Sequence, residues 1–176
     1  MDLPAPQRTE PAIAADERTT LSEFLDYYRT TLLIKVHGLS DDLARRPTVP
    51  PSDLNLMGLV RHMADVERYW FRNRFVGDPD SDPLFYGDPN LGQDPDGDHH
   101  PGPDDTLADA LAAWETEVTF ARTTASDADL DALSAKPIRD GHFSMRWLLV
   151  HMLEEYCRHA GHADLLRECA DGVTGD

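Results

Sequence analysis

The fold is decided by one long stretch near the C-terminus, Ser144-Met-Arg-Trp-Leu-Leu-Val-His-Met-Leu-Glu-Glu-Tyr-Cys-Arg-His-Ala-Gly-His-Ala-Asp-Leu-Leu-Arg-Glu168. Its apolar residues recur every three or four positions, which predicts one long helix with Ser144 as its N-cap. Within about four turns the same stretch holds three histidines and a carboxylate: His151, Glu155, His159 and His162. Such a set is typical of either a metal site or a row of polar side chains along the helix. Whether each side chain points into the protein or toward water decides between the two.

The helical geometry divides these residues into two groups. At about 100° per residue, with His151 set at 0°, Glu155 falls near 40° and His159 near 80°. Both positions lie inside the apolar arc of the helix, which is formed by Leu148, Met152, Tyr156, Ala163 and Leu166. His151, His162 and Arg158 fall along the edge of this arc. Because a buried carboxylate is costly without a charge partner or a metal, Glu155 and His159 are the informative pair.

Three further amphipathic helices precede this stretch, over residues about 16–37, 54–75 and 104–124. In the helix over 54–75, His62 lies in an apolar arc between Leu59 and Val66. Four amphipathic helices joined by long connections predict an all-α fold, a four-helix bundle. We expect a flexible N-terminal arm over residues 1–15, which is rich in proline, and a single bundle domain over 16–172.

The longest connection, over residues 76–103, is rich in glycine, proline and aspartate. A loop of this length in a compact domain is usually either functional or disordered. We expect its apolar residues, Leu84, Phe85 and Tyr86, to anchor it over the mouth of the site. The following Asp98-His-His100 sequence could contact a metal, but a solvated turn is the favoured interpretation.

Composition limits the partners of the chain. It has 176 residues and a formal net charge of −17, which argues against nucleic acid and anionic membranes as partners. No apolar run is long enough to span a bilayer, and the N-terminus lacks the pattern of a signal peptide. The two cysteines, Cys157 and Cys169, fall in the same predicted helix, so a disulfide framework is not expected. These features predict a cytoplasmic protein.

The inward-facing polar residues suggest a metal site. Metal sites in helix bundles are built from inward side chains on facing helices. His62, Glu155 and His159 form such a set, and two histidines with one carboxylate suit zinc, nickel or iron. Three protein ligands leave positions open for water or substrate, as in catalytic sites. Other ligand pairs are His151 with Glu155 or His159 with His162, and a buried hydrogen-bonded network without metal is a further alternative.

Two segments carry a resemblance to a known family: Leu59-Val-Arg-His-Met-Ala-Asp-Val-Glu-Arg-Tyr-Trp70 and the downstream stretch from Trp147 to Glu168. Over residues 18–172 the chain resembles the DinB-like superfamily, in the branch of mycothiol-dependent transferases and maleylpyruvate isomerase. The resemblance implies a four-helix bundle in which a histidine of the second helix and an i, i+4 pair of the last one bind a divalent metal. These positions correspond to His62, Glu155 and His159. That pair is commonly His/His in the superfamily, and members are often homodimers.

The resemblance also implies a chemistry. Some members use a low-molecular-weight thiol, mycothiol or bacillithiol, as cosubstrate, and a cation lowers the pKa of a bound thiol or water. The expected function is a metal-dependent, most simply zinc-dependent, thiol S-transferase or isomerase that acts on small electrophiles in detoxification. Arg158, His162 and Tyr69 are candidates for binding anionic groups or moving a proton. The alternatives are a hydrolase that uses metal-bound water and a non-catalytic bundle that binds a small molecule or responds to stress.

Overall fold

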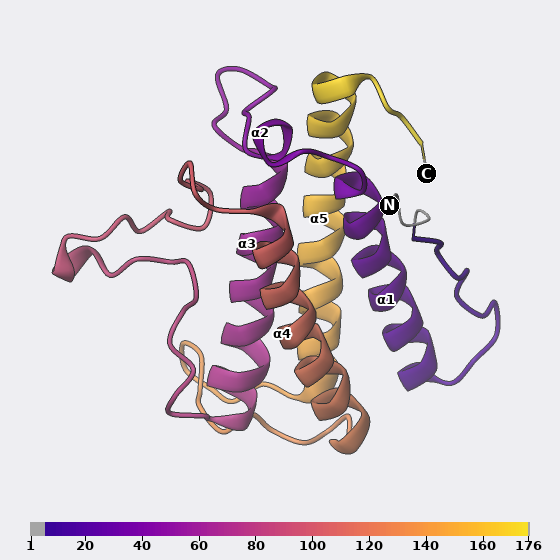
Figure 1. Cartoon of the computed structure of the whole chain (residues 1–176). Coiled ribbons are helices and arrows are strands. Elements are labelled where there is room, and N and C mark those ends of the chain that lie inside the picture. The colour runs from indigo at the N-terminus through magenta and orange to yellow at the C-terminus, as the bar shows by residue number, and fades with distance from the viewer. Residues whose placement is uncertain (1–5, 176) are drawn as a thin grey trace.

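A computed structural model describes residues 6–175 and shows an all-helical chain (Figure 1). The predicted all-α fold is therefore confirmed. The elements are α1 (Glu17–Val36), α2 (Asp41–Ala44), α3 (Leu56–Glu67), the π-helical segment η1 (Arg68–Val76), the 3-10 turn η2 (Pro89–Leu91), α4 (Leu107–Asp127) and α5 (Met145–Asp171). Among residues 6–175, no helix is both long enough and apolar enough to cross a membrane.

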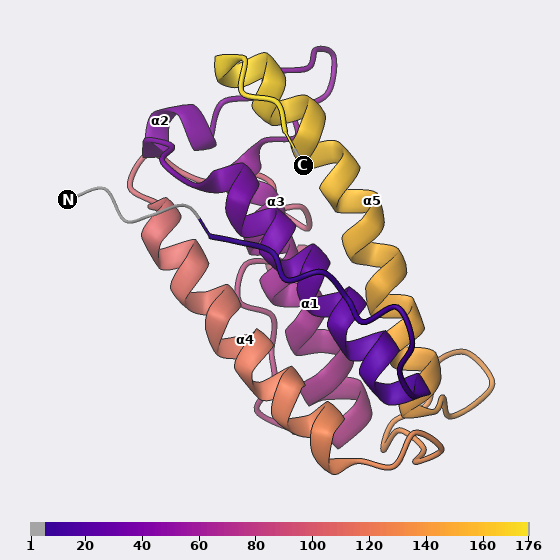
Figure 2. The ribbon, with the colours of Figure 1, turned by 90° about the vertical axis from the view of Figure 1, so that its right-hand side faces the viewer.

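The four long helices, α1, α3, α4 and α5, lie side by side and form the bundle (Figures 1 and 2). Helix α1 packs mainly against α5, α3 packs mainly against α4, and α3 also contacts α5. The contact between α3 and α5 matters most for function, because the candidate metal ligands come from these two helices.

The ends of the helices follow from local chemistry. Ser144 caps α5 as predicted, since its hydroxyl accepts a hydrogen bond from the Trp147 N–H at 3.2 Å. Helix α4 starts at Leu107, later than predicted, because Thr106 is its N-cap. The helix predicted over residues 54–75 starts at Leu56 and continues as a π-helix from Arg68 to Val76. The predicted bounds are nearly right, but the prediction of one regular α-helix is wrong.

A buried hydrogen-bonded chain connects all four long helices. Arg29 of α1 donates two hydrogen bonds of 2.9 Å to the carboxylate of Glu67 in α3. The hydroxyl of Tyr156 in α5 donates to the same carboxylate at 2.8 Å, and Trp114 of α4 donates to that hydroxyl at 2.8 Å. Burial raises the pKa of Glu67, and the Arg29 guanidinium and these hydrogen bonds oppose that effect. Every member is satisfied, as a polar network at the centre of a bundle requires.

The segments outside the bundle lie on its surface. Of the predicted N-terminal arm, residues 1–5 lie outside the described part of the chain. Further along it, the Arg8 guanidinium lies over the Tyr27 ring at 4.7 Å, and the Ala12 N–H donates to Glu23 at 2.7 Å. On the other side of the molecule, the connection between η1 and α4 runs along the outside of α3 and projects from the bundle before it returns (Figure 1).

Candidate metal centre

The structure brings His62, Glu155 and His159 together. His62 comes from α3, and the other two come from successive turns of α5. One ligand atom from each side chain can be chosen so that all three atoms lie within 4.8 Å of one another. The Nε2 of His159 is 3.6 Å from a carboxylate oxygen of Glu155, and the rings of His62 and His159 are 4.6 Å apart between centroids.

These three side chains lie at the boundary between the core and solvent. Their exposed fractions are 15% for His62, 21% for Glu155 and 11% for His159. The i, i+4 spacing stacks Glu155 and His159 on one face of α5, and the packing of α3 on α5 places His62 opposite them. The three side chains are therefore mostly removed from water, and each keeps a small exposed fraction.

His159 is held in the form that binds metals. Burial, assisted by the neighbouring His62 and His162, lowers the pKa of His159 to about 3. The imidazole is therefore neutral near pH 7, and a neutral imidazole has a free nitrogen lone pair. Metal ligation by histidine requires this state.

The donor set fits zinc or a similar divalent ion. Zinc bonds to nitrogen and oxygen of about 2.0–2.2 Å place two ligand atoms of a tetrahedron about 3.3–3.6 Å apart. The 3.6 Å separation of His159 Nε2 and the Glu155 oxygen agrees with this spacing. Three protein ligands would leave a fourth position for water or substrate.

His151 and His162 flank the three residues. The Nε2 of His151 is buried, has no hydrogen-bond partner and is 3.6 Å from the other oxygen of Glu155. The His151 ring lies against Trp70 and is stacked on Trp147, with centroids 4.4 and 5.0 Å away. On the other side, His162 Nδ1 is 3.4 Å from His159 Nδ1. Both edge histidines thus neighbour the candidate ligands, as their angular positions predict.

Arg158 and Tyr69 lie further out. The Arg158 side chain is 59% exposed and pairs with Glu154 at 3.2 Å. Tyr69 is 39% exposed, and its ring is covered by the Arg74 guanidinium at 4.8 Å. Neither residue makes a described contact with the three candidate ligands, and their supporting roles stay predictions.

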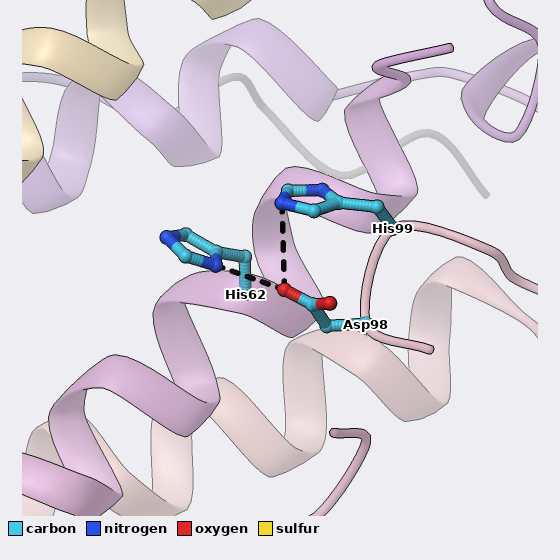
Figure 3. Close-up of side chains that lie close together, drawn as sticks. All are labelled: His62, Asp98 and His99. Atoms are coloured by element: carbon cyan, nitrogen blue, oxygen red, sulfur yellow. Dashed lines mark hydrogen bonds and ion pairs between the residues drawn. The ribbon is translucent and has the colours of Figure 1, made fainter. Parts of the chain in front are cut away.

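The loop over residues 76–103 adds groups that the sequence did not lead us to expect at the site. Asp98 is fully buried, and its Oδ2 is 2.8 Å from His62 Nδ1 (Figure 3). The ring of His99 is stacked on that of His62 with centroids 5.0 Å apart. The interpretation as a solvated turn is therefore wrong for Asp98 and His99. It is right for His100, which is exposed and pairs with Asp94 at 2.5 Å.

The loop is attached to α3 by its own backbone. The N–H groups of Leu84, Phe85 and Tyr86 donate to the Asp65 carboxylate at 2.6, 2.9 and 3.0 Å. The Tyr86 hydroxyl lies 2.7 Å from His62 Nδ1. The expected anchoring by these three residues is observed, although it acts mainly through backbone hydrogen bonds rather than through apolar burial.

We predict that Gly58→Ala destabilises the protein. Alanine is usually favoured over glycine inside a helix by about 0.8–1.0 kcal/mol. At Gly58, however, a Cβ would lie 2.9 Å from His99 Cα and 3.2 Å from the His99 carbonyl oxygen. The loop backbone would have to move, so we expect a net loss of about 1–3 kcal/mol, typical of overpacking, in urea unfolding.

Gly161→Ala in α5 is the matched control, because a Cβ there meets no atom within 4 Å. It should raise the free energy of unfolding by about 0.5–1 kcal/mol. Equal stabilisation by both substitutions would contradict the close packing of residue 99 on α3.

Comparison with known proteins agrees with this geometry. A model of the mycothiol S-transferase family matches residues 20–172, which is most of the chain and includes all three candidate ligands. No curated protein matches the chain. The family match confirms the branch of the DinB-like superfamily predicted from the two helical motifs. The chain belongs to the mycothiol S-transferase family.

Proposed function

We propose that the protein is a zinc-dependent S-transferase that joins mycothiol to small electrophiles, with His62, Glu155 and His159 as the metal ligands. What supports the ligand set is one observation: donor atoms from two helices lie within 4.8 Å of one another. What supports the thiol is the family match over residues 20–172. A homodimeric assembly is a further part of the proposal.

The chemistry follows from the donor set. A bound divalent cation supplies Lewis acidity, which favours the thiolate form of a coordinated thiol near neutral pH. In the net reaction the thiol loses its proton, an S–C bond forms, and the leaving group departs with its electron pair. His162 is half-buried beside His159 and is the nearest candidate to accept that proton. The exposed Arg158 and Tyr69 are placed further out, where they could bind anionic parts of a substrate.

The proposal is tested by following the loss of free mycothiol in the presence of an alkyl halide, with zinc-loaded and chelated protein. We expect turnover only with zinc. Glu155→Gln should lower the rate by at least about 10–100-fold, the loss typical of disturbing groups around a metal. Glu154→Gln is the matched control, because Glu154 is the neighbouring, 59% exposed carboxylate and pairs with Arg158. It should keep the wild-type rate.

The alternatives give different results in the same assay. A metal-dependent hydrolase would consume an ester without any added thiol. A non-catalytic bundle would show no turnover over a broad panel of electrophiles, and chelation would leave its melting temperature unchanged. Either outcome would contradict the proposed transferase.

A further inference from the structure

We propose that Asp98 is a positioning residue that fixes the ring of His62, so that the Nε2 lone pair of His62 faces Glu155 and His159. This inference rests on the metal site proposed above. If Asp98 has this role, the long loop over residues 76–103 contributes a side chain to the metal site and does not only lie over its mouth.

The hydrogen bond between Asp98 and His62 determines where the imidazole proton lies. Asp98 Oδ2 is 2.8 Å from His62 Nδ1, and the Asp98 side chain is fully buried. An ionised carboxylate only accepts hydrogen bonds, and a neutral imidazole carries a single N–H. With an ionised Asp98 and a neutral imidazole, the single N–H of His62 lies on Nδ1 and Nε2 keeps its lone pair. The Tyr86 hydroxyl oxygen, 2.7 Å from Nδ1, is then a second acceptor for the same proton. Figure 3 shows the other ring nitrogen of His62 directed away from Asp98.

Two imidazoles lie against the Asp98 carboxylate. Its Oδ2 is 2.8 Å from His62 Nδ1 and 3.4 Å from His99 Nε2. The Tyr86 hydroxyl lies 2.7 Å from His62 Nδ1, and burial together with the nearby Asp98 carboxylate raises the pKa of Tyr86. Tyr86 therefore stays a neutral phenol beside the Asp98–His62 pair.

Asp98 and His99 can also be considered as ligands of a metal bound with His62, since these three residues form a second group of suitable donors. The 2.8 Å separation of Asp98 and His62 has the length of a hydrogen bond. It is shorter than the spacing of about 3.3–3.6 Å between ligand atoms around zinc. This distance favours a carboxylate that orients the histidine over one that shares a metal with it.

Hydrogen bonds from α3 hold the backbone on both sides of Asp98. On one side of Asp98, Arg61 Nη2 donates to the Gly97 carbonyl at 2.8 Å. On the other side, Asn55 Nδ2 donates to the His99 carbonyl at 2.8 Å. Both donors belong to α3: Asn55 is its N-cap, and Arg61 is the residue directly before His62. The same helix therefore holds the histidine and the loop that orients it.

The first test measures zinc affinity by competition with a chromophoric chelator. Removing a group that orients a metal-binding histidine typically costs about 10–100-fold in affinity, and we expect this loss in Asp98→Ala. Asp98→Asn should lose less, because its amide oxygen can still accept the Nδ1 proton. Asp96→Asn is the matched control, because Asp96 is exposed in the same loop. The zinc affinity of this variant should equal that of the wild-type protein.

The second test is independent of metal and of activity. In ¹⁵N NMR spectra of the metal-free protein near pH 8, His62 should carry its proton on Nδ1 in the wild type. In Asp98→Ala this preference should be lost. A wild-type protein with the proton on Nε2 would overturn the inference.

The outcomes separate this inference from the proposed function. A wild type that binds no zinc would contradict the proposed function itself. A wild type that binds zinc, with unchanged affinity in Asp98→Ala, would overturn only the role of Asp98. Two zinc ions per chain, one of which survives His159→Ala, would also overturn it, because Asp98 and His99 would then be ligands of their own site.

Discussion

Replacing His159 with alanine is expected to weaken zinc binding by more than about 100-fold, beyond the loss that follows from removing an orienting group. His159 provides one of only two nitrogen donors in the proposed site, and alanine offers no ligand atom in its place. Its neutral state near pH 7 means that no proton has to leave before the metal binds. Loss of this donor would leave His62 and Glu155, too few ligands for tight binding.

The measurement is a zinc titration against a competing chelator, with His37→Ala as the control. His37 lies at the C-terminal end of α1, and its described contacts are made by its backbone. The control should bind zinc as the wild type does. Equal affinity in both variants would show that His159 is not a ligand, and the alternative pair His151 with Glu155 would then have to be considered.

Replacing Glu67 with glutamine should cause the largest loss of stability of any single substitution considered. Glu67 is fully buried and is the acceptor at the centre of the chain that joins α1, α3, α4 and α5. Without the charge of Glu67, the buried Arg29 guanidinium keeps only the 44% exposed Asp26 as a charged partner. Breaking a buried pair typically costs about 3–5 kcal/mol. The free energy of unfolding in urea should fall by about this amount.

Two further variants show whether the charge is the cause. Glu115→Gln changes an exposed glutamate of α4 and should alter the free energy of unfolding by less than about 0.5 kcal/mol. Replacing both partners, as Arg29→Met with Glu67→Leu, should recover much of the loss, because paired apolar residues often replace a buried ion pair without cost. A Glu67→Gln variant as stable as the wild type would contradict a structural role for this network.

The helices and the three candidate ligands could be predicted because they depend on local periodicity. The apolar arc of α5 singles out Glu155 and His159, but in the structure the His151 side chain is 17% exposed and that of Glu155 is 21% exposed, so burial does not separate these two residues. His62 is found by the same rule applied to the helix over 54–75. Because the helix repeats every 3.6 residues, about two turns of sequence are enough to show which side chains face the core.

The contribution of the loop could not be predicted in the same way. Asp98 reaches His62 across 36 residues of sequence, and no periodic pattern connects them. Its neighbours are glycine, proline and aspartate, a composition that is equally typical of an exposed turn. One signal was present, namely Gly58 inside a helix, where glycine often allows a close approach of another backbone. Here that backbone belongs to His99.

The central claim is that His62, Glu155 and His159 form a metal site, and its most direct test is elemental analysis of the wild-type protein purified without a histidine tag. We predict about one divalent metal ion per chain, with zinc the most abundant, and a metal content near zero in His62→Ala. A folded wild-type protein that contains no metal and takes up none from added zinc would contradict the claim. The three side chains would then be a buried polar network and nothing more.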